Sequence, residues 1–249
     1  MCKVVQMLVC AGRNETLCCA APIGIGLVEA SLGLTRLLLG GAREIENIIF
    51  VGSAGAYSKE ILIGDMFFSV EATQIESSFL SGGSYTPIDN VVKMESVDLS
   101  GFGDFARFFV SDENLRDKES WQKNVSYETS EQTLKSIQNQ KTENQQKSMR
   151  NGVVAKQIGQ TKQVVVNSSN YITTDESSAN QMAMAGILLE NMEFYAVMKV
   201  AQSFGVPAMG VFCVTNYCDE NAHRDFLANH SKAKRKLEDF ITQSKKAMI

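Results

Sequence analysis

The sequence predicts an α/β fold, a three-layer sandwich around a mixed, partly parallel central sheet. Short uninterrupted apolar runs at 48–51 and from Ala208 onward are typical of buried parallel strands. Helical apolar patterns lie between such runs, as at 27–39. A chain of 249 residues with 44% hydrophobic residues can bury one core of this kind, so we expect a single domain over 1–249.

The composition of the chain indicates which kinds of binding partner it has and in which cellular compartment it works. A net charge of −4 argues against a nucleic-acid or anionic-membrane partner. No run reaches the roughly 18 apolar residues of a membrane-spanning helix, and the first residues do not resemble a signal peptide. The six cysteines form no CxxC pair and lie mostly in apolar runs, which predicts a reduced, cytoplasmic setting.

The N-terminal segment has two β-leaning runs, 3–10 and 16–21, separated by a turn-rich spacer, and this pattern predicts a β-hairpin. Gly24 and Gly26 then precede a helical pattern that runs to Leu39. A dinucleotide-binding fingerprint would need a third glycine where this chain has Glu29. We therefore expect a tight strand-to-helix turn, whose amides a ligand could still approach.

The strand at 48–51 is expected to end in the small-residue turn Gly52–Ala56, where a substrate could lie close to the backbone. A strand follows at 66–70. A polar insertion near 118–151 can bury little and is expected to be a solvated helix or a mobile segment. A strand at 164–166 leads to a helix capped by Thr174 or Asp175, and an exposed basic helix near 232–248 ends the chain.

The stretch 190–216 organises the predicted site. Glu193 begins a helix that ends at Gly205, and the next strand stops at Thr215 and Asn216. A strand that ends on a polar side chain beside a helix that begins on a carboxylate builds a pocket at the sheet edge. The alternative for Glu193 is a carboxylate that only complements the helix dipole.

These motifs, in this order, resemble the nucleoside phosphorylase superfamily, in layout most of all its purine branch of bacterial purine nucleoside phosphorylases and methylthioadenosine/S-adenosylhomocysteine nucleosidases. The resemblance implies that Glu193 binds both ribose hydroxyls, that Met192 packs on the ribose, and that Tyr171 stacks on the base beside Ile172. It implies substrate contacts from the two glycine-containing turns, at Ile25, Ser53, Ala54 and Gly55. Asn216 stands where many relatives carry the acid that protonates the purine.

Three departures from the family pattern matter. Asn216 cannot act as a general acid, although its amide can donate a hydrogen bond to the leaving purine. Trimeric purine nucleoside phosphorylases also carry an asparagine in a Thr-Asn pair at this strand end and favour 6-oxopurines, so the resemblance implies the same preference here. Phe50 occupies the place of the arginine that holds phosphate in bacterial phosphorylases. The chain is expected to begin after the family's first strand and helix, so that Arg13 and Glu15, on a hairpin turn, would be poor substitutes. Arg13 could alternatively bind phosphate in a neighbouring subunit.

The resemblance predicts a purine nucleoside phosphorylase, a pentosyltransferase of purine salvage with phosphate as co-substrate and no cofactor. The alternatives are a purine nucleosidase, or a nucleoside-binding protein that has lost catalysis. A homo-oligomer, dimer or hexamer, is expected. His223 is close enough in sequence to the strand end to reach the site, but it can equally be a surface residue. A zinc site with Cys213 and Cys218 is disfavoured because a fourth ligand is missing.

Overall fold

The computed structural model describes residues 6–40, 45–94 and 163–246, and the polar insertion predicted near 118–151 lies outside them. The described elements alternate between strands and helices as the apolar patterns predict. In chain order they are β1 (Gln6–Cys10), the short 3-10 helix η1 (Arg13–Glu15), β2 (Ala21–Pro22), α1 (Gly26–Gly40), β3 (Asn47–Ala56), β4 (Met66–Thr73), α2 (Ser77–Leu80), β5 (Val91–Lys93), β6 (Gln163–Ser168), α6 (Glu176–Met184), β7 (Ile187–Asn191), α7 (Phe194–Ser203), β8 (Ala208–Tyr217) and α8 (Ala222–Lys246).

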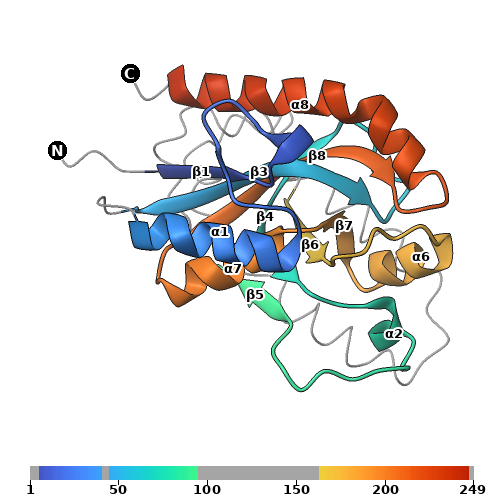
Figure 1. The fold of residues 1–249 in the computed structure, drawn as a ribbon. Helices are drawn as coiled ribbons and strands as arrows, with labels where there is room; N and C mark the ends of the chain where they lie inside the picture. Colours follow the sequence, from blue (N-terminus) through green and yellow to red (C-terminus); the bar gives the residue numbers. More distant parts are fainter. Residues whose placement is uncertain (1–5, 41–44, 95–162, 247–249) are drawn as a thin grey trace, which may run out of the picture.

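Five of these strands close into a ring. β3 pairs in parallel with β8 and antiparallel with β7. β8 pairs antiparallel with β4, and β6 joins β4 to β7 by two parallel ladders. β1 and β2 extend the sheet beyond β3, and β5 extends it beyond β4. The central position of β3 means that its carboxyl end is flanked by both β7 and β8 (Figure 1).

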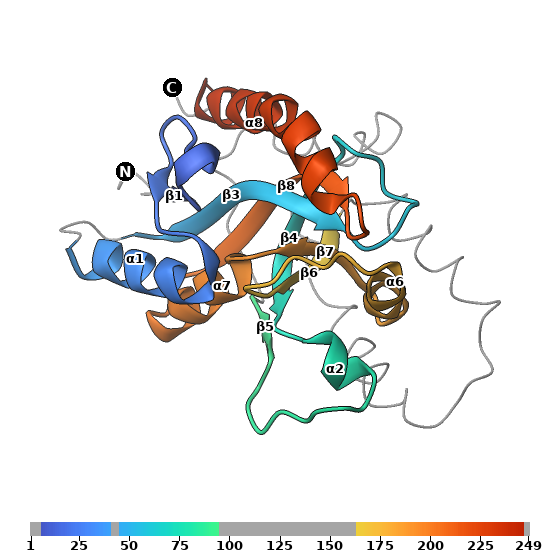
Figure 2. The ribbon, with the colours of Figure 1, turned by 45° about the vertical axis from the view of Figure 1, so that its right-hand side comes forward.

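Helices cover both faces of this sheet, which confirms the predicted three-layer α/β arrangement. α1 and α7 lie on one face and α8 on the other (Figures 1 and 2). The core is divided accordingly, because Phe50, Phe194 and Phe212 are buried on the α1–α7 side while Leu237 and Phe240 of α8 are buried on the other. No helix within the described segments is long and apolar enough to cross a membrane.

The predicted N-terminal hairpin is wrong. β1 and β2 run parallel, with Val9 opposite Ala21 and Cys10 opposite Pro22, and β1 also pairs in parallel with β3. A hairpin requires antiparallel neighbours. The chain instead leaves β1, turns through η1 and returns to start β2 in the same direction, and β2 includes only the last residue of the predicted second run. This path carries η1 to the carboxyl end of β3.

The small-residue segment also differs from the prediction. Gly52, Ser53, Ala54 and Gly55 belong to β3 itself and do not form a turn after it. The pairing register of β3 with β8 shifts between Ala54 and Gly55, which is a local irregularity of the bulge kind. Small side chains therefore line the end of a central strand where its neighbours approach closely.

Helix starts and ends mostly follow the predicted signals. The backbone of Gly24 (φ 110°) and Gly26 (φ 81°) is left-handed, which supports the predicted tight turn before α1. Asp175 caps α6, since its carboxylate accepts a hydrogen bond from the Ser178 amide at 2.8 Å. α8 begins ten residues earlier than predicted, and it is not simply exposed, because one of its faces is buried against the sheet.

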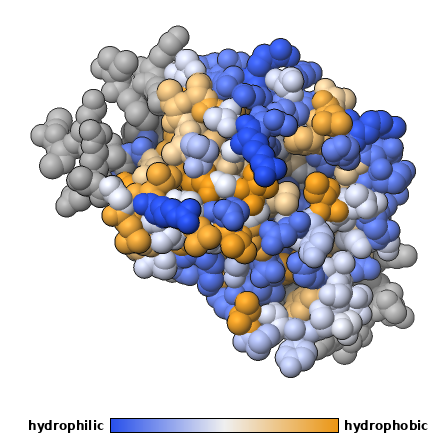
Figure 3. Space-filling view, viewed as in Figure 1, coloured by the Kyte–Doolittle hydropathy of each residue, from blue (hydrophilic) through white to orange (hydrophobic). Residues whose placement is uncertain are grey.

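Apolar side chains gather on the surface over α1 (Figure 3). Val28, Leu32 and Leu39 are exposed there, at spacings of four and seven residues that place them along one face of the helix. Scattered exposed apolar residues are normal, but a row of them on one helix is a typical contact surface.

Candidate functional site

Glu193 lies at the junction of β7 and α7 and is 2% exposed. Its carboxylate accepts a hydrogen bond from the amide of Gly26 at 2.9 Å, so it joins the start of α1 to the start of α7. Burial raises the pKa of the Glu193 carboxyl to about 7, and the Gly26 amide opposes part of that rise. A carboxyl that titrates near neutral pH in a buried corner is a group with functional potential.

Asn191 caps the start of α7 with its side chain. Its Oδ1 accepts hydrogen bonds from the amides of Glu193 and Phe194, both at 2.9 Å. Its Nδ2 donates to the carbonyl of Ser53 at 3.0 Å, which fixes α7 to the end of β3. Sequence reasoning missed this residue, although asparagine just before a helix is a familiar capping signal.

Glu15 does not lie on a hairpin turn, as predicted, but ends η1 between the parallel strands β1 and β2. The Ser53 hydroxyl donates a hydrogen bond to its carboxylate. The parallel return of the chain from β1 to β2 carries Glu15 over β3. Burial raises the pKa of the Glu15 carboxyl, while the Ser53 hydroxyl and His230 lower it.

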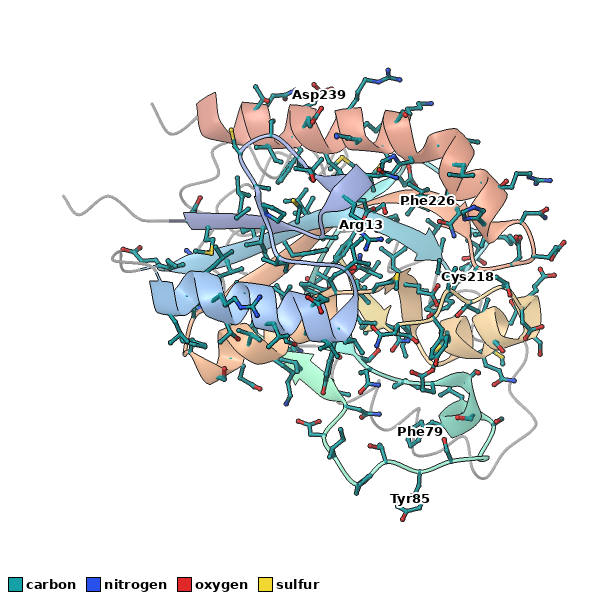
Figure 4. The ribbon with its side chains drawn as sticks, in the orientation of Figure 1. Arg13, Phe79, Tyr85, Cys218, Phe226 and Asp239 are labelled. Atoms are coloured by element: carbon teal, nitrogen blue, oxygen red, sulfur yellow. The ribbon has the colours of Figure 1, made fainter. Side chains whose placement is uncertain are left out.

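A small hollow opens beside this hydrogen bond. Glu15, Leu17, Gly52 and Ser53 line one side of it, and α8 supplies His230, Ala233, Lys234 and Leu237 on the other. Arg13 has an exposed side chain and does not line the hollow; Figure 4 labels it beside the sheet, between α1 and α8 in that view. The hollow therefore holds one carboxylate, one hydroxyl and two basic side chains.

Asn216 lies at the end of β8 and is 6% exposed. Its Oδ1 accepts a hydrogen bond from the Thr215 hydroxyl at 2.9 Å, and its Nδ2 donates to the Tyr217 carbonyl at 3.0 Å. The Nδ2 group carries a second hydrogen that remains for a ligand. Close approach of β3 depends on Gly55, because a Cβ atom there would lie 3.0 Å from the Asn216 Nδ2.

Glu193 and Asn216 stand on either side of the end of β3. Gly55 of β3 is paired with Asn216 in β8 and with Glu190 in β7, three residues before Glu193. The two predicted site residues thus come from neighbouring strand ends, as a pocket at a sheet edge requires. Neither of them lines the hollow at Glu15.

The residues predicted to contact the base lie on the loop between β6 and α6. Tyr171 is 76% exposed and Ile172 is 53% exposed. Asn170 holds this loop to α1, since its Oδ1 accepts a hydrogen bond from the Leu27 amide at 2.9 Å. Ile25 is also exposed beside the start of α1, whereas Ala54 is buried and Met192 is half-buried.

Glu190 anchors the same loop from beneath. Its buried carboxylate accepts hydrogen bonds from the Tyr57 hydroxyl at 2.8 Å and from the Thr173 amide at 3.0 Å. The Thr173 hydroxyl donates to it as well. Sequence reasoning gave no signal for this residue, because an acid in an apolar strand looks like an outward-facing position.

Phe50, which stands in the sequence where bacterial phosphorylases carry a phosphate-binding arginine, is part of the hydrophobic core. The Phe50 ring is fully buried, with its centroid 6.2 Å from that of Phe194 and 5.9 Å from that of Phe212. This side chain points into the α1–α7 side of the core, so its place in the sequence offers no cation to the end of β3.

The two histidines of α8 differ. His223 is exposed, so it does not take the site position that its place in the sequence allowed, while His230 lines the hollow. In the described segments, no group of three or more histidine, cysteine, aspartate or glutamate side chains could hold a metal ion. Cys218 lies instead at the end of β8 and donates from its thiol to Glu190 at 3.8 Å (Figure 4).

Comparison with known proteins decides the family. The family model described as the phosphorylase superfamily matches residues 4–245, almost the whole chain. The chain belongs to the phosphorylase superfamily. At this level it is a nucleoside phosphorylase or nucleosidase type of protein, as the sequence resemblance predicted. No curated protein matches it by sequence.

Solved structures of this superfamily share its fold. Futalosine hydrolase of Helicobacter pylori is 16% identical, with a TM-score of 0.61 and 97% of each chain covered. The 5′-methylthioadenosine/S-adenosylhomocysteine nucleosidase of H. pylori is 15% identical, also with a TM-score of 0.61 and 97% coverage of each chain. S-adenosylhomocysteine nucleosidase of Streptococcus pyogenes is 12% identical, with a TM-score of 0.60, covering 98% of this chain and 97% of that one.

Proposed function

We propose that this superfamily member cleaves the N-glycosidic bond of a purine ribonucleoside, preferably a 6-oxopurine one, with water as the acceptor. The observation that carries the choice of water is the Glu15 carboxylate on Ser53 at the end of β3. A carboxylate at that place can take a proton from water, whereas it repels a phosphate dianion. The burial of Phe50 supports the same choice, because no cation stands at its position.

The roles of the other residues follow from their places. Glu193 accepts hydrogen bonds from the ribose hydroxyls, with Met192 packed on the sugar. Tyr171 and Ile172 contact the base, and Ile25, Ala54 and Gly55 contact the nucleoside from the two glycine-containing segments. Holding sugar and base in one geometry lowers the barrier of such a reaction.

The chemical step balances with these groups. The water oxygen forms a bond to C1′ as the bond from C1′ to N9 breaks, and the bonding electrons leave with the purine. One proton of the water goes to Glu15 and the remaining hydroxyl stays on C1′; Glu15 then returns its proton to solvent, and the departed purine anion takes up a proton from solvent to become the neutral base. Asn216 donates a hydrogen bond to the purine ring as negative charge develops there, which stabilises the departing base without transferring a proton.

Phosphorolysis, the purine nucleoside phosphorylase activity predicted from the sequence, is the second candidate. His230 and Lys234 favour it, since both line the hollow beside Ser53 and can attract an anion. In that reaction phosphate replaces water at C1′ and ribose 1-phosphate is formed. We retain the predicted cytoplasmic location, single domain and homo-oligomer for either reaction; the exposed apolar row on α1 suits a subunit contact.

One experiment separates the candidates. The purified protein is incubated with inosine, with and without inorganic phosphate, and hypoxanthine and the sugar product are quantified. We expect free ribose and a rate that phosphate does not increase. Strictly phosphate-dependent release of hypoxanthine with ribose 1-phosphate would replace hydrolysis by phosphorolysis. Binding of inosine by calorimetry without turnover would support a nucleoside-binding protein, and faster cleavage of adenosine than of inosine would contradict the 6-oxopurine preference.

Glu15→Gln tests the residue that carries the proposal. The amide keeps a hydrogen bond to Ser53 but cannot accept a proton, so hydrolysis should fall by about 100-fold or more. Glu60→Gln, at an exposed glutamate of the loop after β3, is the matched control and should keep the wild-type rate. Equal activity of both variants would exclude Glu15 as the base.

A further inference from the structure

α8 brings two basic side chains to the hollow at Glu15. His230, Ala233, Lys234 and Leu237 line it at the spacing of one helix face. Ala233 and Leu237 are also buried against the sheet, so the apolar contact that holds α8 in place fixes the direction of His230. The imidazole is further held by Phe226, one turn earlier, with ring centroids 4.9 Å apart (Figure 4 labels Phe226).

The charges that face Glu15 can be named element by element. Ser53 of β3 donates a hydrogen bond to it. Glu193 is a second carboxyl close enough for Glu15 to raise its pKa, so the two acids oppose each other's ionisation. On α8, His230 and Lys234 are the basic groups that line the hollow. Burial raises the pKa of the Glu15 carboxyl, and a positive charge on the His230 side chain acts in the opposite direction.

We propose that His230 is a positioning residue that keeps Glu15 ionised as the acceptor of the water proton. The inference rests on the proposed hydrolysis and adds a part of the machinery from the C-terminal helix. A half-buried carboxylate beside a second carboxyl is more easily protonated, and a protonated carboxyl cannot act as a base. Burial removes part of the hydration that stabilises the Glu15 carboxylate. In the proposal, a positively charged His230 imidazole on the other side of the hollow compensates for that loss.

The kinetic test compares His230→Gln with His223→Gln, at an exposed histidine on the same helix. Hydrolysis of inosine is followed as kcat/KM against pH. Since the base works only when ionised, loss of the cation should move the acid limb of the profile to higher pH, by about one unit. At the low-pH end of the profile, kcat/KM of His230→Gln should therefore be about tenfold below that of the wild type. At the high-pH end, the two values should be equal.

His230→Lys restores a positive charge and should return the acid limb toward the wild-type position. His223→Gln should leave the profile unchanged. A uniform loss of rate at every pH in His230→Gln would assign the residue a merely structural role and overturn the proposal. An effect seen only as a raised KM for phosphate would assign it to phosphate binding instead and would also overturn it.

A second measurement does not depend on activity. The side-chain carboxyl carbons are labelled with ¹³C, and the Glu15 resonance, identified by its loss in Glu15→Gln, is titrated by NMR. Its midpoint should move to higher pH in His230→Gln and stay in place in His223→Gln. An unmoved midpoint would refute the role of His230 while leaving hydrolysis intact. Absence of nucleoside cleavage in the wild type, with a moved midpoint, would refute hydrolysis while leaving the pair of residues intact.

Discussion

Replacement of Glu193 by glutamine should make the protein more stable at neutral pH. The buried carboxyl accepts a hydrogen bond from the Gly26 amide, and the Asn191 side chain and the Met192 backbone also favour its ionised form, but no cation pairs with it among the contacts found in the described residues. Glutamine keeps an oxygen for Gly26 and removes the cost of burying a charge. The same change should weaken nucleoside cleavage, because the proposed hydrogen bonds to the ribose hydroxyls lose their charged acceptor.

The magnitude follows from the pKa of the Glu193 carboxyl, which burial raises from 4.5 to about 7. Between these two pH values the unfolded chain releases the proton while the folded protein keeps it. The folded state therefore binds more protons, and this carboxyl makes stability fall as pH rises through the window. The shift corresponds to about 3 kcal/mol once the pH exceeds 7. Glu193→Gln should thus match the wild type near pH 4.5 and exceed it by up to about 3 kcal/mol at pH 8.

Urea denaturation followed by circular dichroism at several pH values measures this difference. Glu60→Gln, at an exposed glutamate, serves as the control and should track the wild type throughout. Turnover of inosine should fall by about 10- to 100-fold in Glu193→Gln, the worth of a hydrogen bond to a charged group. A stability difference that does not change with pH, or a less stable variant at pH 8, would refute the reasoning.

Other substitutions test the packing and the strand end. Phe50→Ala should cost about 3–5 kcal/mol, seen as a lower urea midpoint, because it empties the centre of an aromatic cluster. Gly33→Ala should destabilise the protein, since a Cβ atom would lie 1.8 Å from the Ile23 carbonyl oxygen, whereas Gly40→Ala meets no atom within 4 Å and should stabilise α1 by up to about 1 kcal/mol. Asn216→Asp should raise the ratio of adenosine to inosine cleavage about tenfold, measured as kcat/KM, because a carboxyl can protonate the adenine ring.

Sequence patterns predict correctly those structural features that depend on interactions between residues close together in the chain. The apolar runs of β3 and β8 are buried on both faces, so their composition alone distinguishes them from their surroundings. The Asp175 cap depends on the amide of Ser178, only three residues later in the chain, so the local sequence is enough to predict it. The order of the motifs was also enough to indicate the superfamily before any coordinates.

Apolar runs and motif order therefore predict the layers, the principal strands and the family. Which side chains meet depends on how the chain is folded in three dimensions. Glu15 reaches Ser53 across 38 positions because β1 and β2 are parallel, and Glu193 reaches Gly26 across 167 positions because two helices begin at one corner. Such contacts depend on strand direction and sheet closure, which are set by the burial of the whole core and leave no periodic mark in the residues themselves.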